Sequence, residues 1–366
     1  MRILFLEQFS SLGGAQRSLL ELLPAVRRAN WEAHVGLPDD GPLAARLREQ
    51  EALIHVLPLS QYSDGPKHLS DAARFLRDLA VLPAEIRKLD KLLEPAVLYV
   101  NGPRLMPAVW RAGLGRPVIF HSHNYVSIWN GKPLVAAALN ATRATVLAAT
   151  RFVAHQWGAR ARVIYGGVDG PPPDWRRAAR ASGPRIGMIG RIEPDKRQKE
   201  FVLAAAELTP EMPDAEFLLC GDARQGDEAA LRYKREVLAS APASLKYLGW
   251  SDDVYEVLSK LDLLVLPSRC EGGVPYVLLD AFSAGVPVLA SPVGDLAETI
   301  RDGENGFLLH SASPSGIARR LRELLSMPER LALAAGNARR LWRQRFTAER
   351  FRQEMWEVIL ATARRN

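Results

Sequence analysis

The stretch that decides the fold is Pro267–Gly285, which reads PSRCEGGVPYVLLDAFSAG. Just before it, the apolar run LDLLVLP at 261–267 has the length and composition of a buried strand. At its end, Gly285 and a nearby proline terminate the helical pattern. The spacing therefore predicts a strand, a glycine-rich turn and a helix, with Glu271 on the loop and Asp280 inside the helix.

The two acids on either side of this turn are candidate ligands for hydroxyl groups. In an open α/β sheet, the loops that follow the strands border the ligand crevice, and helix N-termini favour anions. An ionised carboxylate only accepts hydrogen bonds, so Glu271 and Asp280 suit the hydroxyls of a sugar or a ribose. A solvated Glu and an Asp on a helix face are the alternative that spacing alone leaves open.

Strand and helix patterns alternate along the whole chain, which favours parallel, doubly wound sheets. In the first half, apolar runs predict six strands, at 2–7, 32–38, 51–59, 96–101, 117–123 and 161–169. The helices expected between them are at 16–29, 42–50, 70–93 and 132–149.

Three consecutive prolines, Pro171–Pro173, interrupt the pattern and indicate a linker. Beyond them the alternation resumes, with strands expected at 185–191, 215–222, 244–250, 261–267, 287–294 and 306–310. The expected helices are at 199–208, 227–239, 252–260, 277–284, 297–302 and 314–325, and a final helical region covers about 330–365.

These patterns predict an α/β chain of two Rossmann-like, doubly wound domains, because 366 residues are too many for one ordinary core. The expected parts are an N-terminal domain, a Pro-rich hinge, a C-terminal domain and a last helix, at 1–170, 171–182, 183–345 and 346–366.

The composition is that of a globular protein, with 48% apolar and 24% charged residues. Two cysteines make no disulfide framework or zinc spacing, which favours a reducing cytoplasm. The sequence has neither a run of about 20 apolar residues nor a signal-peptide pattern at its start.

The net charge of +7 is unevenly distributed. Residues 95–168 contain eight Arg or Lys and no Asp or Glu, and residues 319–366 contain twelve Arg against five Glu. Such stretches suit nucleic acid, anionic lipid or an anionic substrate. No nucleic-acid-binding module is present, so we expect no nucleic-acid partner. Free use of Arg in a GC-rich genome would give the same composition.

Three further groups of residues follow predicted strands. Gly13, Gly14 and Gln16 lie where the first strand leads into a helix, and glycines there let backbone approach a ligand. The pattern is not the GxGxxG of a dehydrogenase. Arg191 and Lys196 follow the strand at 185–191 and suit a diphosphate, or are solvated surface charges.

The third group is His121, His123 and Asn124, at the end of the strand at 117–123. A lone His is more often a satisfied polar residue than a catalyst, and no neighbouring carboxylate favours a metal site. In the second half, Gly221 and Trp250 also follow strands, although an aromatic there is more often a core residue.

In combination these motifs resemble retaining glycosyltransferases of the GT-B fold, glycosyltransferase family 4. The segment at 267–285 is similar to the nucleotide-sugar signature of that family, Gly190–Lys196 to its Gly-Arg-x4-Lys motif, and Gly13–Ala15 to its Gly-Gly-Ala turn. Eight residues separate Glu271 from Asp280 where the family has seven, and Asp280 and Arg197 replace a Glu and a Gly.

The resemblance implies two Rossmann-like domains facing across a cleft, with the last helix crossing back to the first domain. It implies that Asp280 binds the ribose, that Glu271 and the backbone near Gly272, Gly273 and Val274 hold the hexose, and that Arg191 and Lys196 stabilise the diphosphate. Gly13, Gly14, Gly221 and Trp250 would border the donor, and His121 would contact its sugar. Gln16, His123 and Asn124 would face the acceptor.

The function expected from the resemblance is transfer of a hexose from a UDP- or GDP-linked donor, without a metal or other cofactor. The acceptor would be a sugar, a lipid-linked saccharide or a small molecule, and the basic stretches favour an anionic membrane surface, at the inner face of the plasma membrane. A degenerate binding or scaffold protein and a sugar-nucleotide epimerase are the alternatives.

Overall fold

The computed structural model describes residues 1–60, 69–126, 131–178, 183–224 and 226–365. The chain divides into two compact units, one of Met1–Gly167 with Ala348–Asn366 and one of Val168–Thr347. Residues 179–182 of the expected hinge lie outside the described residues. In the described part of the chain, no helix has the length and apolar character needed to cross a membrane.

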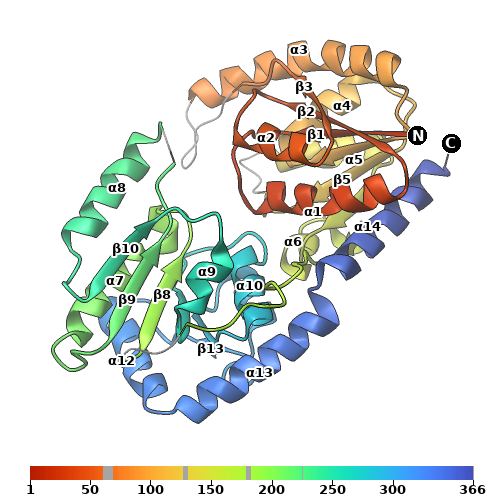
Figure 1. Cartoon of the computed structure of the whole chain (residues 1–366). Helices are drawn as coiled ribbons and strands as arrows, with labels where there is room; N and C mark the ends of the chain where they lie inside the picture. The colour runs from red at the N-terminus through yellow and green to blue at the C-terminus, as the bar shows by residue number, and fades with distance from the viewer. Residues whose placement is uncertain (61–68, 127–130, 179–182, 225, 366) are drawn as a thin grey trace. The chain divides into compact units, whose positions relative to one another are not determined.

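The first unit is built on a parallel sheet of seven strands in the order β3-β2-β1-β4-β5-β6-β7 (Figure 1). The strands are β1 (Arg2–Glu7), β2 (Glu32–Leu37), β3 (Leu53–Val56), β4 (Val97–Asn101), β5 (Val118–Ser122), β6 (Thr145–Ala148) and β7 (Ala161–Val163). The helices are α1 (Gly14–Arg28), α2 (Pro42–Glu49), α3 (Leu69–Leu93), α4 (Met106–Ala112), α5 (Lys132–Ala141), α6 (Arg151–His155) and α14 (Ala348–Ala363), with 3₁₀ turns η1 (Pro103–Leu105) and η3 (Gly158–Arg160).

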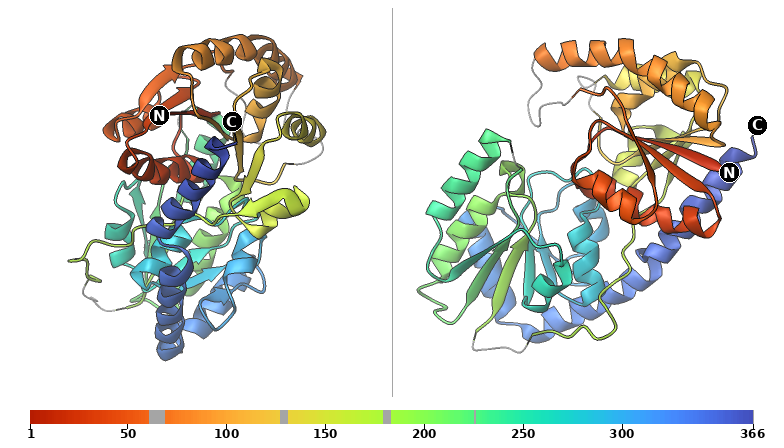
Figure 2. Two further views of the ribbon diagram at one scale, coloured as in Figure 1. Left: turned by 90° about the vertical axis from the view of Figure 1, so that its right-hand side faces the viewer. Right: turned by 45° about the horizontal axis from the view of Figure 1, so that its top comes forward.

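Side chains of β1 alternate between two apolar cores, one on each face of this sheet. Ile3 and Phe5 join the core that includes Leu22 of α1 and Phe351 of α14. Leu4 and Leu6 join the core formed with α3, α4 and α5. Helices therefore cover both faces of the sheet, as the near-continuous apolar character of its strands predicts (Figure 2).

The second unit has a parallel sheet of six strands in the order β10-β9-β8-β11-β12-β13. The strands are β8 (Arg185–Ile189), β9 (Glu216–Cys220), β10 (Leu245–Gly249), β11 (Leu263–Leu266), β12 (Val288–Ala290) and β13 (Phe307–Leu308). The helices are α7 (Gln198–Leu208), α8 (Glu228–Ala239), α9 (Val254–Ser259), α10 (Tyr276–Ala284), α11 (Gly294–Thr299), α12 (Pro314–Leu325) and α13 (Pro328–Arg345), with the 3₁₀ turn η4 (Pro194–Lys196).

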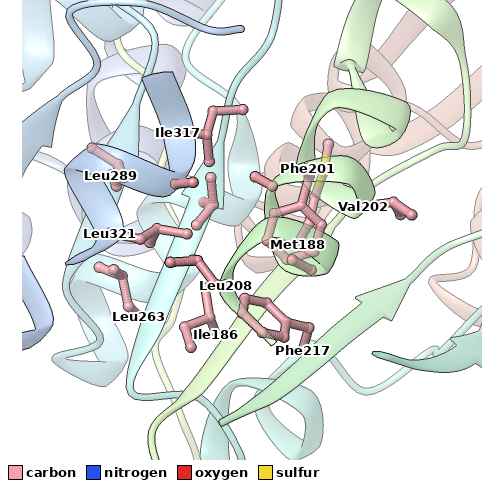
Figure 3. Close-up of a cluster of buried hydrophobic side chains, with 14 of the residues drawn as sticks. Ile186, Met188, Phe201, Val202, Leu208, Phe217, Leu263, Leu289, Ile317 and Leu321 are labelled. Atoms are coloured by element: carbon pink, nitrogen blue, oxygen red, sulfur yellow. The ribbon is translucent and has the colours of Figure 1, made fainter. Parts of the chain in front are cut away.

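This sheet also carries a core on each face. Phe201 of α7, Phe217 of β9 and Leu321 of α12 meet in one of them (Figure 3). Leu278 and Phe282 of α10 pack into the other. The α/β fold with two doubly wound parallel sheets, predicted from the sequence, is confirmed.

Two predictions for the first half are wrong. The helix expected at 132–149 ends at Ala141, and Thr145–Ala148 form β6. Arg143 adopts a left-handed backbone conformation with φ of 50°, so the helix stops without the glycine that normally signals its end. The strand expected at 161–169 covers only Ala161–Val163, and the short helices α4 and α6 were not predicted.

The final helical region consists of two helices. α13 ends at Arg345, and Phe346 and Thr347 separate it from α14. α13 belongs to the second unit, while residues 348–366 group with the first. In that unit, Arg352 of α14 forms an ion pair of 2.8 Å with Glu21 of α1.

Candidate active site

In the second unit, Lys196 and Glu271 meet where the strand order reverses, and Arg191 lies on the same loop as Lys196. β8 and β11 are neighbours in the sheet, and the three residues follow the carboxyl ends of these strands. Lys196 Nζ lies 2.6 Å from Glu271 Oε1, and Arg191 Nη2 lies 3.3 Å from Glu193 Oε1. The Arg191 side chain keeps 40% of its surface exposed. This edge of an open α/β sheet is where ligands bind.

Backbone contacts hold the loop that carries the two cations. Gln198 Nε2 donates a hydrogen bond of 2.6 Å to the carbonyl of Arg191, and Arg269 N donates one of 2.7 Å to the carbonyl of Asp195. Arg197 has a left-handed conformation with φ of 60°. Family 4 usually has a Gly at this position, and Gly adopts this conformation without strain.

Close backbone packing explains Gly221. A Cβ atom on Gly221 would lie 1.9 Å from the carbonyl oxygen of Gly190, and its φ of 138° is unfavourable for other residues. Gly221 N also donates a hydrogen bond of 2.7 Å to the carbonyl of Gly249. The ends of β8, β9 and β10 therefore meet through backbone atoms.

The loop that carries Glu271 packs against the start of α11. Gly294 has φ of 50°, and a Cβ there would lie 2.2 Å from the carbonyl oxygen of Glu271. Val274 packs its side chain against an apolar core, while Gly272 and Gly273 are half-buried. Gly294 was not predicted as a site residue, although it is the glycine that ends the apolar run at 287–294.

Asp280 lies between two helices and is buried. Its Oδ1 accepts a hydrogen bond of 3.1 Å from the Tyr255 hydroxyl of α9. The same hydroxyl lies 3.2 Å from Ser283 Oγ. The carboxylate of Asp280 thus has a protein donor at one oxygen.

Trp250 follows β10 and is 53% exposed. Its Nε1 donates a hydrogen bond of 3.1 Å to Asp252 Oδ1. The interpretation of Trp250 as a core residue is therefore wrong, and its ring surface is open to solvent.

In the first unit, a buried polar network lies where β1 and β4 adjoin, again at a reversal of strand order. Glu7 is fully buried, and its Oε1 accepts hydrogen bonds of 3.0 Å from Phe9 N and from Gln16 Nε2. Its Oε2 accepts one from Asn101 Nδ2. Burial raises the pKa of Glu7 to about 7, although these hydrogen bonds act in the opposite direction.

Of this network, only Gln16 was predicted from the sequence as a site residue, and Glu7 and Asn101 were not. Glu7 could have been found from the sequence, because it is an ionisable side chain at the end of an otherwise apolar strand. Gly13 precedes α1 and Gly14 begins it, and a Cβ on Gly13 would lie 2.8 Å from Gln16 Oε1. The glycine turn thus contacts a member of the network.

The two histidines of β5 and its following loop lie beside this network. His121 is buried, with its Nδ1 2.6 Å from the Tyr99 hydroxyl, and its Nε2 is buried with no partner among the described residues. His123 is half-buried, with its Nε2 2.6 Å from Asn101 Oδ1. Burial holds the pKa of His121 well below its usual value and lowers that of His123 to about 3, so both rings are neutral at physiological pH.

Asn124 is exposed, and its backbone carbonyl accepts a hydrogen bond of 2.9 Å from Gln156 Nε2. The predicted residues thus form two sets, one at the switch point of each sheet. The second unit holds the cations and acids, and the first unit holds the glycine turn, Gln16 and the histidines. Within the described ranges, no group of three or more His, Cys, Asp and Glu could hold a metal ion.

Two family models match the chain. Residues 13–185 match the glycosyl transferase 4-like domain, and residues 183–327 match glycosyl transferases group 1.

Curated relatives are similar over part of the chain. The putative glycosyltransferase EpsD of Bacillus subtilis is 31% identical over 46% of this chain and 42% of its own length. The 2-deoxystreptamine glucosyltransferase of Streptomyces kanamyceticus is 32% identical over 54% and 53%. An exopolysaccharide phosphotransferase of Streptomyces coelicolor is 27% identical over 76% of this chain and 30% of its own. The matched regions thus span about a third to a half of the length of these three relatives.

Solved structures are similar over nearly the whole chain. HepE of Anabaena, in complex with UDP-glucose, has a TM-score of 0.79 at 22% identity, covering 99% of this chain and 100% of its own. Sucrose-phosphate synthase from Thermosynechococcus elongatus has a TM-score of 0.78 at 17% identity, covering 98% of each chain. These similarities establish the GT-B fold, and the two family matches, which together span residues 13–327, establish that this chain belongs to the group 1, family 4-like glycosyl transferases.

Proposed function

We propose that this chain is a retaining glycosyltransferase that moves a hexose from a nucleotide-diphosphate sugar to an acceptor hydroxyl, in polysaccharide, glycolipid or glycoside biosynthesis. The observation that carries the proposal is the 2.6 Å contact of Lys196 with Glu271 at the switch point of the second sheet. An ammonium group suits the diphosphate of such a donor, and a carboxylate suits its sugar hydroxyls. The names of the relatives EpsD and 2-deoxystreptamine glucosyltransferase support the same reaction class.

When no donor is bound, Lys196 and Glu271 form an ion pair with each other. A bound donor would break this pair and give each side chain its own contact. Its diphosphate would bind Lys196 Nζ and the partly exposed Arg191 side chain, which then stabilise the charge that develops as the nucleotide leaves. Glu271, released from Lys196, would accept hydrogen bonds from hexose hydroxyls, beside the backbone amides of Gly272, Gly273 and Val274.

For the nucleoside, we propose that Asp280 accepts hydrogen bonds from the ribose hydroxyls and that Trp250 stacks on the base. Tyr255 occupies one face of Asp280 Oδ1, so the ribose would share this carboxylate with Tyr255. Gly221 would border the donor with backbone atoms only, because a glycine has no side chain between the strand end and the ligand.

The acceptor side of the proposal rests on the first unit. His123, Asn124 and Gln16 would face the acceptor, and Gly13 and Gly14 would border the donor diphosphate. His121 would contact the transferred sugar once local rearrangement uncovers its Nε2, which is buried and has no partner among the described residues.

The donor we expect is UDP- or GDP-linked. HepE was crystallised with UDP-glucose, and a relative in Corynebacterium glutamicum is named as GDP-mannose-dependent. Thermal unfolding with UDP, GDP, ADP, dTDP and their common sugars tests the donor site. A ligand at 100 times its Kd stabilises by about 2.7 kcal/mol, which raises the midpoint by several degrees.

Transfer itself is tested with the stabilising sugar nucleotide and a panel of methyl glycosides and lipid-linked saccharides. NMR of the new glycosidic bond gives its anomeric configuration, and inversion would contradict the retaining assignment. No metal is included in the proposal, because Arg191 and Lys196 supply the charge that neutralises the diphosphate. Transfer should therefore continue in EDTA, and a loss that Mg²⁺ or Mn²⁺ restores would contradict this.

A degenerate binding or scaffold protein is the second candidate, and the burial of Asp280 against Tyr255 favours it. Under this alternative no sugar nucleotide raises the unfolding midpoint. Asp280→Asn separates the two, since it should weaken donor binding in a transferase and leave a scaffold unchanged. An altered sugar nucleotide without transfer would instead indicate an epimerase.

A further inference from the structure

The end of β1 is joined to the loop after β5 by a continuous chain of hydrogen bonds. Glu7 and Asn101 are register partners in β1 and β4, and Asn101 pairs in turn with His121 of β5. Asn101 Nδ2 donates to Glu7 Oε2, and Asn101 Oδ1 lies 2.6 Å from His123 Nε2. Glu7 and Asn101 are both buried, so water does not compete for these bonds.

This chain fixes the proton on His123. The ionised Glu7 only accepts hydrogen bonds, and the Ala15 carbonyl accepts a longer one of 3.3 Å from the same Asn101 Nδ2. Together they orient the Asn101 amide with its NH₂ group toward β1 and its carbonyl toward His123. An amide carbonyl only accepts, so His123 Nε2 must carry the ring proton. The neutral ring then has an unprotonated Nδ1, which is not buried and has no partner among the described residues.

We propose that Glu7 is a positioning residue which, through Asn101, holds His123 in the Nε2–H tautomer, so that Nδ1 accepts a hydrogen bond from a hydroxyl of the acceptor. The contact with an acceptor hydroxyl rests on the proposed function, whereas the tautomer of His123 does not. Glu7 and Asn101 thus have roles although they do not themselves touch the substrate.

In the variant Glu7→Gln we expect the other tautomer of His123, with the ring proton on Nδ1. Glu7 Oε1 accepts from the backbone N–H of Phe9, which cannot rotate away, and from Gln16 Nε2. The new side-chain amide has a single oxygen, which must therefore stay on that side, and its NH₂ group must face Asn101. Two NH₂ groups would then face each other, which costs more than the long 3.3 Å bond from Asn101 Nδ2 to the Ala15 carbonyl contributes. The Asn101 amide therefore turns over, its NH₂ faces His123 Nε2, and the ring proton moves to Nδ1 by exchange with solvent.

The groups around Glu7 make it the titrating member of the chain near neutral pH. Its contacts are amides, from α1, β4 and its own loop, and no Lys or Arg in the described part of the chain forms an ion pair with it. The other titratable side chains of these strand ends are Tyr99, His121 and His123, and both histidines stay neutral. Arg104, on the turn after β4, lies over the Phe9 ring at 5.3 Å.

The first test measures the tautomer in the free, full-length protein by ¹⁵N NMR with labelled histidine, assigned with His123→Ala. At pH 8 we expect the proton of His123 on Nε2 in the wild type and in the control Glu49→Gln, an exposed Glu of the same unit. In Glu7→Gln we expect it on Nδ1. A wild-type proton on Nδ1, or an unchanged tautomer in Glu7→Gln, would overturn the inference.

If Glu7→Gln does not fold, a pH titration of the wild type tests the same link between Glu7 and the His123 tautomer. Lowering the pH from 8 to 5.5 protonates Glu7 and leaves only the 3.3 Å bond to the Ala15 carbonyl to orient Asn101, so the two nitrogen shifts of His123 should move toward each other. Constant shifts over this range would contradict the assignment.

The second test uses the methyl glycoside that accepts sugar fastest. Glu7→Gln should raise its KM about tenfold, the value of one hydrogen bond, with a smaller change in kcat. The change should vanish when His123 is already alanine, because the two residues act through one bond. Equal effects in both backgrounds would overturn the hydroxyl contact, whereas absence of transfer to any acceptor would contradict the proposed function and leave the tautomer result standing.

Discussion

At the scale of single residues, burial of Glu7 makes the stability of the first unit depend on pH. Its folded pKa of about 7 lies above its usual value of 4.5, so the folded state binds a proton more tightly than the unfolded chain. The resulting stabilisation is complete below pH 4.5 and is lost as the pH rises through 7. From pH 5.5 to 8, the free energy of unfolding should fall by about 2 kcal/mol more in the wild type than in Glu7→Gln. Urea unfolding at both pH values measures this, and parallel pH dependence in the two proteins would contradict it.

Lys196 is the residue on which the proposed donor site depends most. Lys196→Ala removes a charge that stabilises the leaving diphosphate, so kcat for transfer should fall by about 10²–10³. Lys199→Ala is the matched control, because Lys199 is the second residue of α7, is half-buried, and pairs at 3.5 Å with Glu236. Steady-state kinetics with the identified donor measures both, and a similar loss in the control would remove the specific role of Lys196.

Most of the residue pattern at the second site could be predicted, because Arg191, Lys196 and Glu271 lie on loops that directly follow strands. The contact between Lys196 and Glu271 could not, since 75 residues separate them. Glu7 and Asn101 are 94 residues apart, and neither belongs to a local motif. Their significance arises only when β1 and β4 become neighbours in the sheet.

At the scale of elements, all six strands of the second unit could be predicted from apolar runs bounded by Gly and Pro. The first unit was harder where such boundaries are missing. The apolar stretch that contains α5 and β6 has no Gly or Pro between Lys132-Pro133 and Gly158, and a non-glycine residue in the left-handed conformation separates the helix from the strand. Local propensity does not reveal that kind of boundary.

A similar conformation connects η4 with α7, where Arg197 has φ of 60°. The left-handed conformation costs about 1–2 kcal/mol for a residue with a Cβ. Replacing Arg197 also removes its ion pair with Glu200, but this contact is long, at 3.9 Å from Nε to Oε1, and contributes little stability. Arg197→Gly should therefore raise the unfolding midpoint of the second unit by a few degrees. Calorimetry against Arg197→Ala, which keeps the Cβ, separates backbone strain from charge, and equal midpoints for the two variants would contradict the strain.

At the scale of the whole molecule, both sheets follow the same rule: strand order reverses once in each, and polar residues collect at the strand ends there. In the first unit these are Glu7, Gln16 and Asn101, and in the second Arg191, Lys196 and Glu271. The fold could be predicted because alternation and burial repeat along the chain. Which polar residues face one another depends on strand order, which the sequence pattern leaves open.

The uneven charge of the chain leads to a prediction about membranes. Arg111, Arg143 and Arg162 are exposed, and among the described residues none of the three pairs with an acid. Each basic residue near an anionic surface contributes about 1 kcal/mol, so replacing all three by Gln should weaken binding to phosphatidylglycerol vesicles by about 100-fold at low salt.

The control replaces Arg46 and Arg48, exposed arginines of the same unit that pair with Glu49 and Asp40. Their charge is already compensated, so vesicle binding should change little. Sedimentation with phosphatidylglycerol and with phosphatidylcholine vesicles measures both variants. High salt should abolish wild-type binding, because screening reduces exposed charge interactions over about 10 Å at 0.1 M. Equal binding to the two lipids would show that these basic residues do not direct the protein to a membrane.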